Sequence, residues 1–201
     1  MNNIGRLREF VKSFTKFIET ARGDEERVFV EGRSLLAELI THDDWLPEQF
    51  AKPDSERYRQ YLLYCDPMER FSVASFVWGP GQKTPVHDHT VWGMVGVMRG
   101  IELCEEFSLD AATGRLLSGG THEVPGGGID LVSPRIGDIH RVSNALADRA
   151  SISIHVYGAN IGAVKRHVYD LPNGRSSTFI SGYSRDVIPN IWDRSGESAT
   201  A

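Results

Sequence analysis

The sequence predicts a mainly β fold with α-helices at its N-terminal end, and two observations lead to this prediction. Near the start, apolar residues recur every three or four positions, which is typical of amphipathic helices. From about residue 56, short β-branched or aromatic segments are separated by glycine, proline or aspartate, and such close spacing is typical of an antiparallel sandwich or barrel. The 20 glycines among 201 residues suit a fold with many tight turns.

Two stretches before residue 50 have helical spacing, and residues 43–50 are expected to form a short helical connector. We therefore predict that residues 1–50 form a helical segment packed on a β-barrel of residues 51–192, with residues 193–201 as a flexible tail. The apolar positions of the two stretches are Ile4, Leu7, Phe10, Phe14 and Phe17, and then Val28, Leu35, Leu36, Leu39 and Ile40.

Six segments after residue 55 are predicted to be strands of this barrel. Each is rich in β-branched or aromatic residues and lies next to a turn-forming residue. In chain order they read YRQYLLYCD, RFSVASFVWGPG, HTVWGMVGVMRG, IELCEEFSL, GIDLVS and RASISIHVYG. No internal repeat is found, so we expect one barrel rather than an array of units.

Composition argues against several classes of function. The net charge is −5 and no basic stripe is present, which argues against a nucleic-acid partner. No segment approaches the roughly 20 apolar residues of a membrane span, and the first twenty residues carry too many charges for a signal peptide. We therefore expect a cytoplasmic protein in which Cys65 and Cys104 are free thiols. The oligomeric state is not encoded in any pattern that we find.

Two histidines lie one residue apart in TPVHDHTVWGMVG, residues 84–96. Alternate residues of a strand face the same side, so His87 and His89 are expected to point together while Asp88 turns away. For such a pair alone, chance placement or a structural role is as good an explanation as metal binding. A third candidate, His140, lies in GIDLVSPRIGDIHRVSN, residues 128–144.

The two segments together resemble the paired motifs of the cupin superfamily, whose fold is a jelly-roll β-barrel. In cupins the first motif supplies two histidines, usually a glutamate, and a closing glycine, and the second motif supplies a further histidine. The resemblance therefore implies a divalent metal on His87, His89 and His140, and a barrel without metal is the alternative. The flanking residues that match are Gly81, Gly100, Gly128, Pro134, Gly137 and Asn144, with one extra residue between Pro134 and Gly137.

Gly93 occupies the glutamate position of the first motif, four residues after His89. Three neutral imidazoles would leave about three open metal positions and would add no negative charge. A metal held in this way keeps its +2 charge and favours an anionic ligand such as a thiolate. Imidazole suits Fe, Ni, Cu and Zn, so the spacing does not choose among these metals.

The segment SISIHVYG places Ser153, His155 and Tyr157 on one face of a strand and three aliphatic residues on the other. Buried polar groups must find hydrogen-bond partners inside the protein, which favours a Ser–His–Tyr chain. The alternative is a ladder that only stiffens the barrel. A serine hydrolase is a weaker hypothesis, because no carboxylate lies in the ladder and no Gly-x-Ser-x-Gly motif is present.

The three histidines and this ladder together resemble the cysteine dioxygenase family of thiol dioxygenases, over roughly residues 55–170. The resemblance implies Fe(II) on the histidines and the addition of both atoms of O2 to the sulfur of a small thiol carboxylate, which gives a sulfinate. It implies that Tyr157 donates a hydrogen bond to bound oxygen or substrate, that His155 orients Tyr157, and that Ser153 anchors the far end.

Two departures place the chain nearer to bacterial 3-mercaptopropionate dioxygenases. Mammalian-type enzymes have a cysteine near the position of Gly93, linked to the tyrosine that corresponds to Tyr157, and an arginine at the position of Gln60. The bacterial enzymes have glycine and glutamine there and take their carboxylate-binding arginine from a later segment, which Arg166 matches. The alternative for Arg166 is a solvated surface charge.

This resemblance favours 3-mercaptopropionate as the substrate, with Arg166 holding its carboxylate and Gln60 adding a polar contact. L-Cysteine and mercaptosuccinate are alternative substrates. A non-catalytic metal-binding cupin is the alternative from another class of function.

Overall fold

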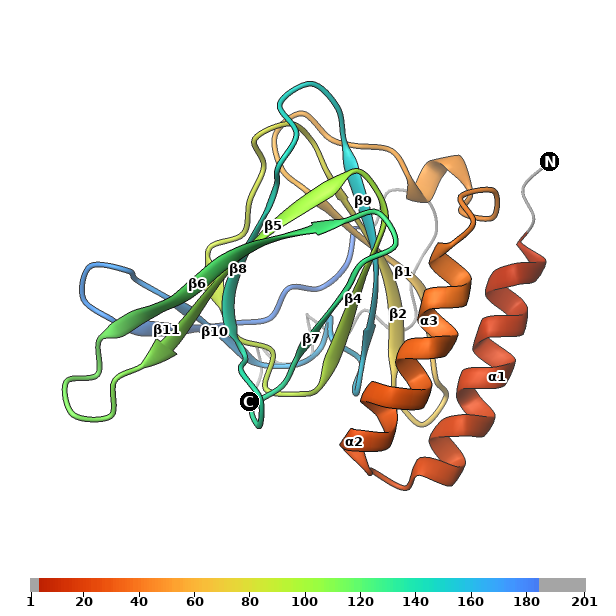
Figure 1. Cartoon of the computed structure of the whole chain (residues 1–201), viewed down its shortest axis with the longest axis horizontal. Helices are drawn as coiled ribbons and strands as arrows, with labels where there is room; N and C mark the ends of the chain where they lie inside the picture. The colour runs from red at the N-terminus through yellow and green to blue at the C-terminus, as the bar shows by residue number, and fades with distance from the viewer. Residues whose placement is uncertain (1–3, 185–201) are drawn as a thin grey trace.

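Two antiparallel β-sheets form the body of the protein in the computed structural model, which describes residues 4–184 (Figure 1). One sheet has the strand order β1-β2-β9-β4-β7, and the other has the order β11-β10-β3-β8-β5-β6. The strands are β1 Arg59–Cys65, β2 Ser72–Trp78, β3 Val86–His87, β4 Gly93–Arg99, β5 Ile101–Leu109, β6 Leu116–Pro125, β7 Ile129–Val132, β8 Ile139–Asn144, β9 Ser151–Tyr157, β10 Arg166–Tyr169 and β11 Ser176–Phe179.

The N-terminal helices lie side by side against the five-stranded sheet (Figure 1). The first helix ends at Ala21. Its C-cap residue Arg22 has a left-handed φ of 50°, and Gly23 follows with a φ of 82°. The second helical run begins where the Asp24 carboxylate accepts a hydrogen bond from the Arg27 backbone N–H. The helices are α1 Gly5–Ala21, α2 Glu25–Arg27, a π-helical turn η1 Val28–Gly32, α3 Arg33–Ile40 and a 3-10 turn η2 Glu48–Phe50.

One hydrophobic core joins the helices to the sheet. The Phe14 ring of α1 is fully buried, and its centroid lies 4.9 Å from that of Phe71 beside β2. The aliphatic side chains of β9 belong to the same core cluster, which fixes the orientation of that strand. Because side chains alternate along a strand, Ser153, His155 and Tyr157 face the opposite way, into the barrel. The predicted alternation in SISIHVYG is therefore confirmed.

The six predicted strand segments all contain strands, but several strands were not predicted. β6 is largely exposed and polar, and β10 and β11 are only four residues long, so none of them has a strong apolar pattern. The expectation that His87 and His89 lie in one strand is wrong. β3 ends at His87, Thr90 has a φ of 60°, and β4 begins only at Gly93.

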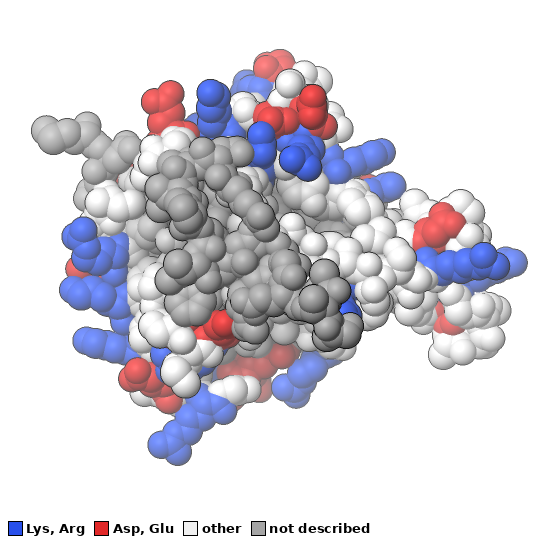
Figure 2. Space-filling view, turned by 180° about the vertical axis from the view of Figure 1, so that it is seen from behind, with Lys and Arg blue, Asp and Glu red and all other residues white. Residues whose placement is uncertain are grey.

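The predicted boundaries of the helical segment and the barrel remain predictions. The tail predicted at 193–201, and residues 185–192 of the predicted barrel, lie outside the described residues. Within residues 4–184 no helix is long and apolar enough to cross a membrane. Figure 2 shows acidic and basic side chains interspersed around one face, with no continuous stripe of either sign on its described atoms.

Candidate active site

Three histidines from neighbouring segments converge inside the barrel. His87 of β3 is the direct register partner of His140 of β8, and His89 follows β3. All three are buried, and one ring nitrogen from each lies within 4.8 Å of the others. The three ring centroids are 4.8–4.9 Å apart. The structure therefore brings together the three residues that the sequence identified as candidate metal ligands.

The outer nitrogen of each imidazole already has a partner in the protein. His87 Nδ1 donates to the Pro85 carbonyl oxygen at 3.2 Å, and His140 Nδ1 lies 3.5 Å from Cys104 Sγ. Asp138 accepts from His89 Nδ1 at 2.9 Å and also from the His89 backbone N–H. These contacts leave the three Nε2 atoms as the available donors, which is the usual arrangement of histidine ligands.

One buried atom in this cluster tests whether a metal fits. His89 Nε2 is fully buried and has no hydrogen-bond partner among the described residues. Buried polar atoms are rarely left unsatisfied, so an ion between the three Nε2 atoms would account for this one. A second group of possible ligands, Cys104, His122 and Asp130, differs in this respect, because His122 Nε2 already donates to Asp130 at 2.8 Å. The His87–His89–His140 cluster therefore fits a divalent metal.

Burial keeps the three imidazoles uncharged. Desolvation lowers the pKa of His87 and His140 well below the usual value. Desolvation also lowers the pKa of His89, although the hydrogen bond to Asp138 acts in the opposite direction. Since a metal binds only the neutral ring, the site is in its ligating form at neutral pH.

A cavity of about 270 Å³ opens beside the histidines. Every predicted site residue except Ser153 lines it, and several lining residues were not predicted from the sequence. The predicted residues are Gln60, His87, His89, His140, His155, Tyr157 and Arg166, and the others are Tyr58, Phe76, Trp78, Thr84, Pro85, Val142, Val168, Phe179 and Ser181. Within residues 4–184, no aspartate or glutamate lines the cavity.

The Ser–His–Tyr ladder forms a continuous hydrogen-bonded chain that ends at the cavity. Ser153 Oγ lies 2.8 Å from His155 Nε2, and His155 Nδ1 lies 2.8 Å from Tyr157 Oη. The Trp78 indole N–H donates to Ser153 Oγ at 3.3 Å. Desolvation lowers the pKa of His155 and raises that of Tyr157, so the imidazole is neutral and the phenol keeps its proton.

Arg166 of β10 is buried in the cavity wall, with only 4% of its surface exposed. Its Nη2 donates to Ser181 Oγ at 2.7 Å, and its Cζ lies 4.7 Å from the centre of the Phe179 ring. No carboxylate within residues 4–184 forms an ion pair with it, and its Nε lacks a hydrogen-bond partner there. The alternative that Arg166 is a solvated surface charge is therefore wrong.

Gln60 of β1 also turns a polar group toward the cavity. It is buried, and its side-chain Nε2 has no hydrogen-bond partner in the described part of the chain. The adjacent Arg59 turns away and donates to Asp54 at 2.6 Å, as the alternation along a strand predicts. A ligand in the cavity therefore meets unsatisfied N–H groups of both Gln60 and Arg166.

Gly93 packs directly on the ring of Tyr157. It is the register partner of Tyr157, and a Cβ at this position would lie 2.6 Å from Tyr157 Cδ1 and 2.9 Å from Val132 Cγ2. Both distances are far shorter than ordinary carbon contacts. A side chain at position 93 is therefore incompatible with the observed position of the Tyr157 ring.

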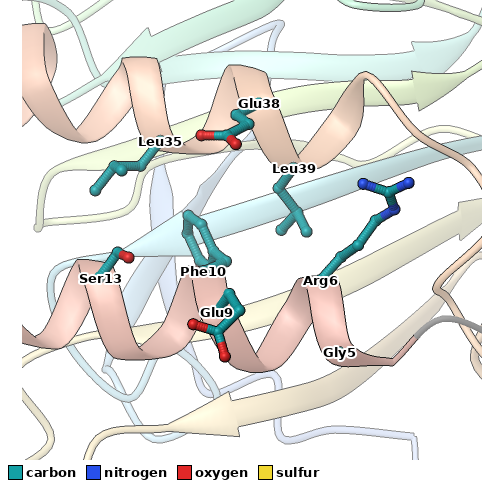
Figure 3. A pocket seen from close by; sticks show the side chains of 8 residues that line it. All are labelled: Gly5, Arg6, Glu9, Phe10, Ser13, Leu35, Glu38 and Leu39. Carbon is teal, nitrogen blue, oxygen red and sulfur yellow. The ribbon is translucent and has the colours of Figure 1, made fainter.

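A separate hollow of about 380 Å³ lies between α1 and α3, outside the barrel. Figure 3 shows Phe10 of α1 and Leu39 of α3 pointing toward each other across it, with Glu9 and Glu38 nearby. None of the three clustered histidines lines this hollow, whereas all three line the barrel cavity.

The chain matches a known protein family. The family model for cysteine dioxygenase type I matches residues 35–170, which is more than half of the chain. The chain is also similar to the solved structure of a conserved protein with a double-stranded β-helix domain from Klebsiella pneumoniae, with 16% identity, a TM-score of 0.43, and coverage of 59% of this chain and 90% of that chain.

Two further solved structures share a similar level of likeness. One is a cupin 2 conserved barrel domain protein from Rhodopseudomonas palustris, with 16% identity, a TM-score of 0.44, and coverage of 61% of this chain and 76% of that chain. The other is a cupin-like protein from Thermotoga maritima, with 19% identity, a TM-score of 0.40, and coverage of 53% and 74%. The predicted fold class, a mainly β cupin barrel with N-terminal helices, is confirmed.

The packing of Gly93 leads to a prediction about stability. Gly93→Ala should force the Tyr157 ring to move and should lower the free energy of unfolding by about 1–3 kcal/mol, as overpacking in a core does. Urea denaturation of the two proteins measures this difference. Gly126→Ala is the matched control, because a Cβ there meets its nearest atom at an ordinary 3.7 Å. Equal stability of the Gly93→Ala variant and the parent protein would contradict the packing described above.

Proposed function

Because the chain belongs to the cysteine dioxygenase type I family, we propose that it is an Fe(II)-dependent thiol dioxygenase acting on a small thiol carboxylate, with 3-mercaptopropionate as the favoured substrate. The observation that carries this proposal is a three-histidine cluster that shares one cavity with a buried arginine lacking a described carboxylate partner. The product is the sulfinate that forms when both atoms of O2 add to the sulfur.

The Nε2 atoms of His87, His89 and His140 are proposed to hold the iron. When bound, the iron supplies a Lewis acid that lowers the thiol pKa and a centre at which thiolate and O2 meet. Asp138 fixes the tautomer and orientation of His89, and the Pro85 carbonyl does the same for His87.

Arg166 is proposed to bind the substrate carboxylate. A buried guanidinium without a counter-charge is costly, so an anion entering the cavity gains both a charge-assisted hydrogen bond and relief of that cost. Gln60 would donate a further hydrogen bond from Nε2. A short substrate held at its carboxylate has its sulfur fixed relative to the histidines, which lowers the entropy cost of reaction.

The charge of the cavity wall favours 3-mercaptopropionate over L-cysteine. Arg166 lines the cavity, and among the described lining residues no aspartate or glutamate is present to receive a substrate ammonium group. 3-Mercaptopropionate carries only the carboxylate that the wall complements, whereas cysteine in its common form also brings a positive charge. Mercaptosuccinate brings a second carboxylate, for which the described part of the lining offers no second lysine or arginine.

Tyr157 is proposed to donate its hydroxyl hydrogen into the cavity. His155 holds the phenol oxygen at 2.8 Å, and Ser153 holds His155 in turn. A neutral phenol with a raised pKa remains a donor across the neutral range, which suits a group that stabilises charge developing on oxygen.

The first experiment measures O2 consumption by the ferrous protein. With 3-mercaptopropionate we expect uptake that matches sulfinate formed, and a kcat/KM about tenfold or more above that for L-cysteine or mercaptosuccinate, since a missing charge complement costs at least about 1.4 kcal/mol. A preference for L-cysteine would assign the activity to that alternative substrate. No uptake with any of the three thiols would favour a non-catalytic metal-binding cupin.

Arg166 provides a second, independent prediction. Arg166→Met should raise the KM for 3-mercaptopropionate by about 10–100-fold, because a hydrogen bond to a charged group is worth about 1.5–3 kcal/mol. The same change should barely affect 1-propanethiol, which lacks the carboxylate. Arg141→Met is the matched control, because Arg141 pairs with Glu105 at 2.6 Å and does not line the cavity. Equal losses with both thiols would remove Arg166 from carboxylate binding.

A further inference from the structure

A buried glutamate lies behind the Ser–His–Tyr chain, at the end away from the cavity. Glu102 of β5 is only 1% exposed, and neither of its carboxyl oxygens has a hydrogen-bond partner among the described residues. The polar groups that face it are the hydroxyls of Ser153 and Ser151 and the indole N–H of Trp78. Glu102 does not line the cavity, so it reaches the substrate only through the chain.

The surroundings of Glu102 favour its neutral form. Desolvation raises the pKa of this carboxyl to about 8, although the facing hydroxyls act in the opposite direction. The Ser151 hydroxyl is also buried without a partner in the part of the chain that the structure describes. A neutral carboxyl has one O–H to donate and a carbonyl oxygen that accepts, so it can serve the hydroxyls of both Ser153 and Ser151.

The hydrogen bonds of the Ser–His–Tyr chain can run in either of two directions, and the protonation state of Glu102 selects between them. When Glu102 is neutral and donates to Ser153, Ser153 donates to His155 Nε2, His155 Nδ1–H donates to Tyr157, and the Tyr157 O–H is free to donate into the cavity. When Glu102 is a carboxylate it accepts from Ser153, and His155 Nε2–H then donates to Ser153. In that state Tyr157 donates to His155 Nδ1 and offers only lone pairs to the cavity.

The two states differ by one proton, and the atoms balance. In going from the first state to the second, the Glu102 proton passes to Ser153, the Ser153 proton to His155 Nε2, the Nδ1 proton to Tyr157, and the Tyr157 proton to an acceptor in the cavity. No oxidant or reductant is needed. Because Glu102 is buried, this chain gives it a route for exchanging its proton with the cavity.

We propose that Glu102 is a positioning residue that sets the direction of the Ser153–His155–Tyr157 chain, so that its neutral form makes Tyr157 a hydrogen-bond donor to the cavity and its ionised form reverses the chain. The consequence for catalysis rests on the proposed thiol dioxygenase function. The direction of the hydrogen bonds among Ser153, His155 and Tyr157 does not depend on that function, so the two proposals can be tested separately.

Three other ionisable groups lie near Glu102 or at the far end of the hydrogen-bonded chain. Asp130 of β7 and Cys104 of β5 face it, and Tyr157 ends the chain on β9. Asp130 carries the negative charge that disfavours ionisation of Glu102, and burial raises the pKa of both Cys104 and Tyr157. The residue of β2 that faces Glu102 is Trp78, which carries no charge.

The test is nitrogen-15 NMR of the histidine rings in the metal-free protein, with His155 assigned from a His155→Gln variant. The parent protein should show His155 protonated on Nδ1 two pH units below about 8, and on Nε2 two units above it. Glu102→Gln should hold the Nδ1–H tautomer across the whole range, because the amide does not ionise and its N–H₂ replaces the O–H donor of the neutral carboxyl. Glu106→Gln, on the exposed part of the same strand, should behave as the parent protein does.

A second variant keeps the test decisive if Glu102→Gln does not fold. Ser153→Ala retains the carboxyl but removes the link to His155, so the His155 tautomer should no longer change near pH 8. A parent protein whose His155 tautomer never changes would overturn the proposal. So would a Glu102→Gln or Ser153→Ala variant in which the tautomer changes as it does in the parent protein.

The ferrous enzyme provides the link to activity. In the parent protein kcat should fall about tenfold per pH unit above about pH 8, and this fall should be absent from Glu102→Gln. The same fall of kcat above about pH 8 in both enzymes would show that Glu102 has no role in turnover. Absence of O2 uptake in both would contradict the dioxygenase proposal instead, and would leave the NMR result on the chain direction unchanged.

Discussion

The site depends on three uncharged imidazoles that are held in a desolvated barrel with their outer nitrogens already bonded. Pro85, Asp138 and Cys104 occupy the Nδ1 side of the rings, so the Nε2 atoms converge and His89 Nε2 has no described protein partner. Forming such a cluster without an ion leaves the buried His89 Nε2 unsatisfied, which costs free energy. A metal that binds the three nitrogens removes this cost, and the neutral ligands leave its charge available to attract a thiolate.

β9 couples this site to the stability of the fold. One face of the strand supplies aliphatic side chains to the core under α1 and α3, and the other supplies the polar chain that ends at Tyr157. Its neighbours β2 and β4 complete the arrangement, because Trp78 donates to Ser153 and Gly93 leaves room for the Tyr157 ring. The chain is thus held between two packed surfaces, so that its hydrogen bonds are short and shielded from water.

Local patterns identified much of this site, while contacts between distant segments did not show in the sequence. The helices, six strand segments, three histidines and the ladder follow from periodicity and from motif spacing. Asp138 was missed because its bond to His89 spans 49 positions, although GDIH places a carboxylate two residues before His140. Glu102 was missed because IELCEEF contains three glutamates, and only its alternation with buried Cys104 marks it as inward-facing. The statement that no carboxylate accompanies the ladder holds for its own strand but not for the folded protein.

The most direct measurement is an anaerobic calorimetric titration of Fe(II) into the metal-free protein, which gives the number of ions bound per chain and their affinity. We predict one ion per chain, no binding at this site in His140→Ala, and about 10–100-fold weaker binding in Asp138→Asn, since removing such a partner weakens a ligand without deleting it. His122→Ala, in the separate group with Cys104 and Asp130, should bind as the parent protein does. Full-strength binding by His140→Ala, or its loss in His122→Ala alone, would contradict the account.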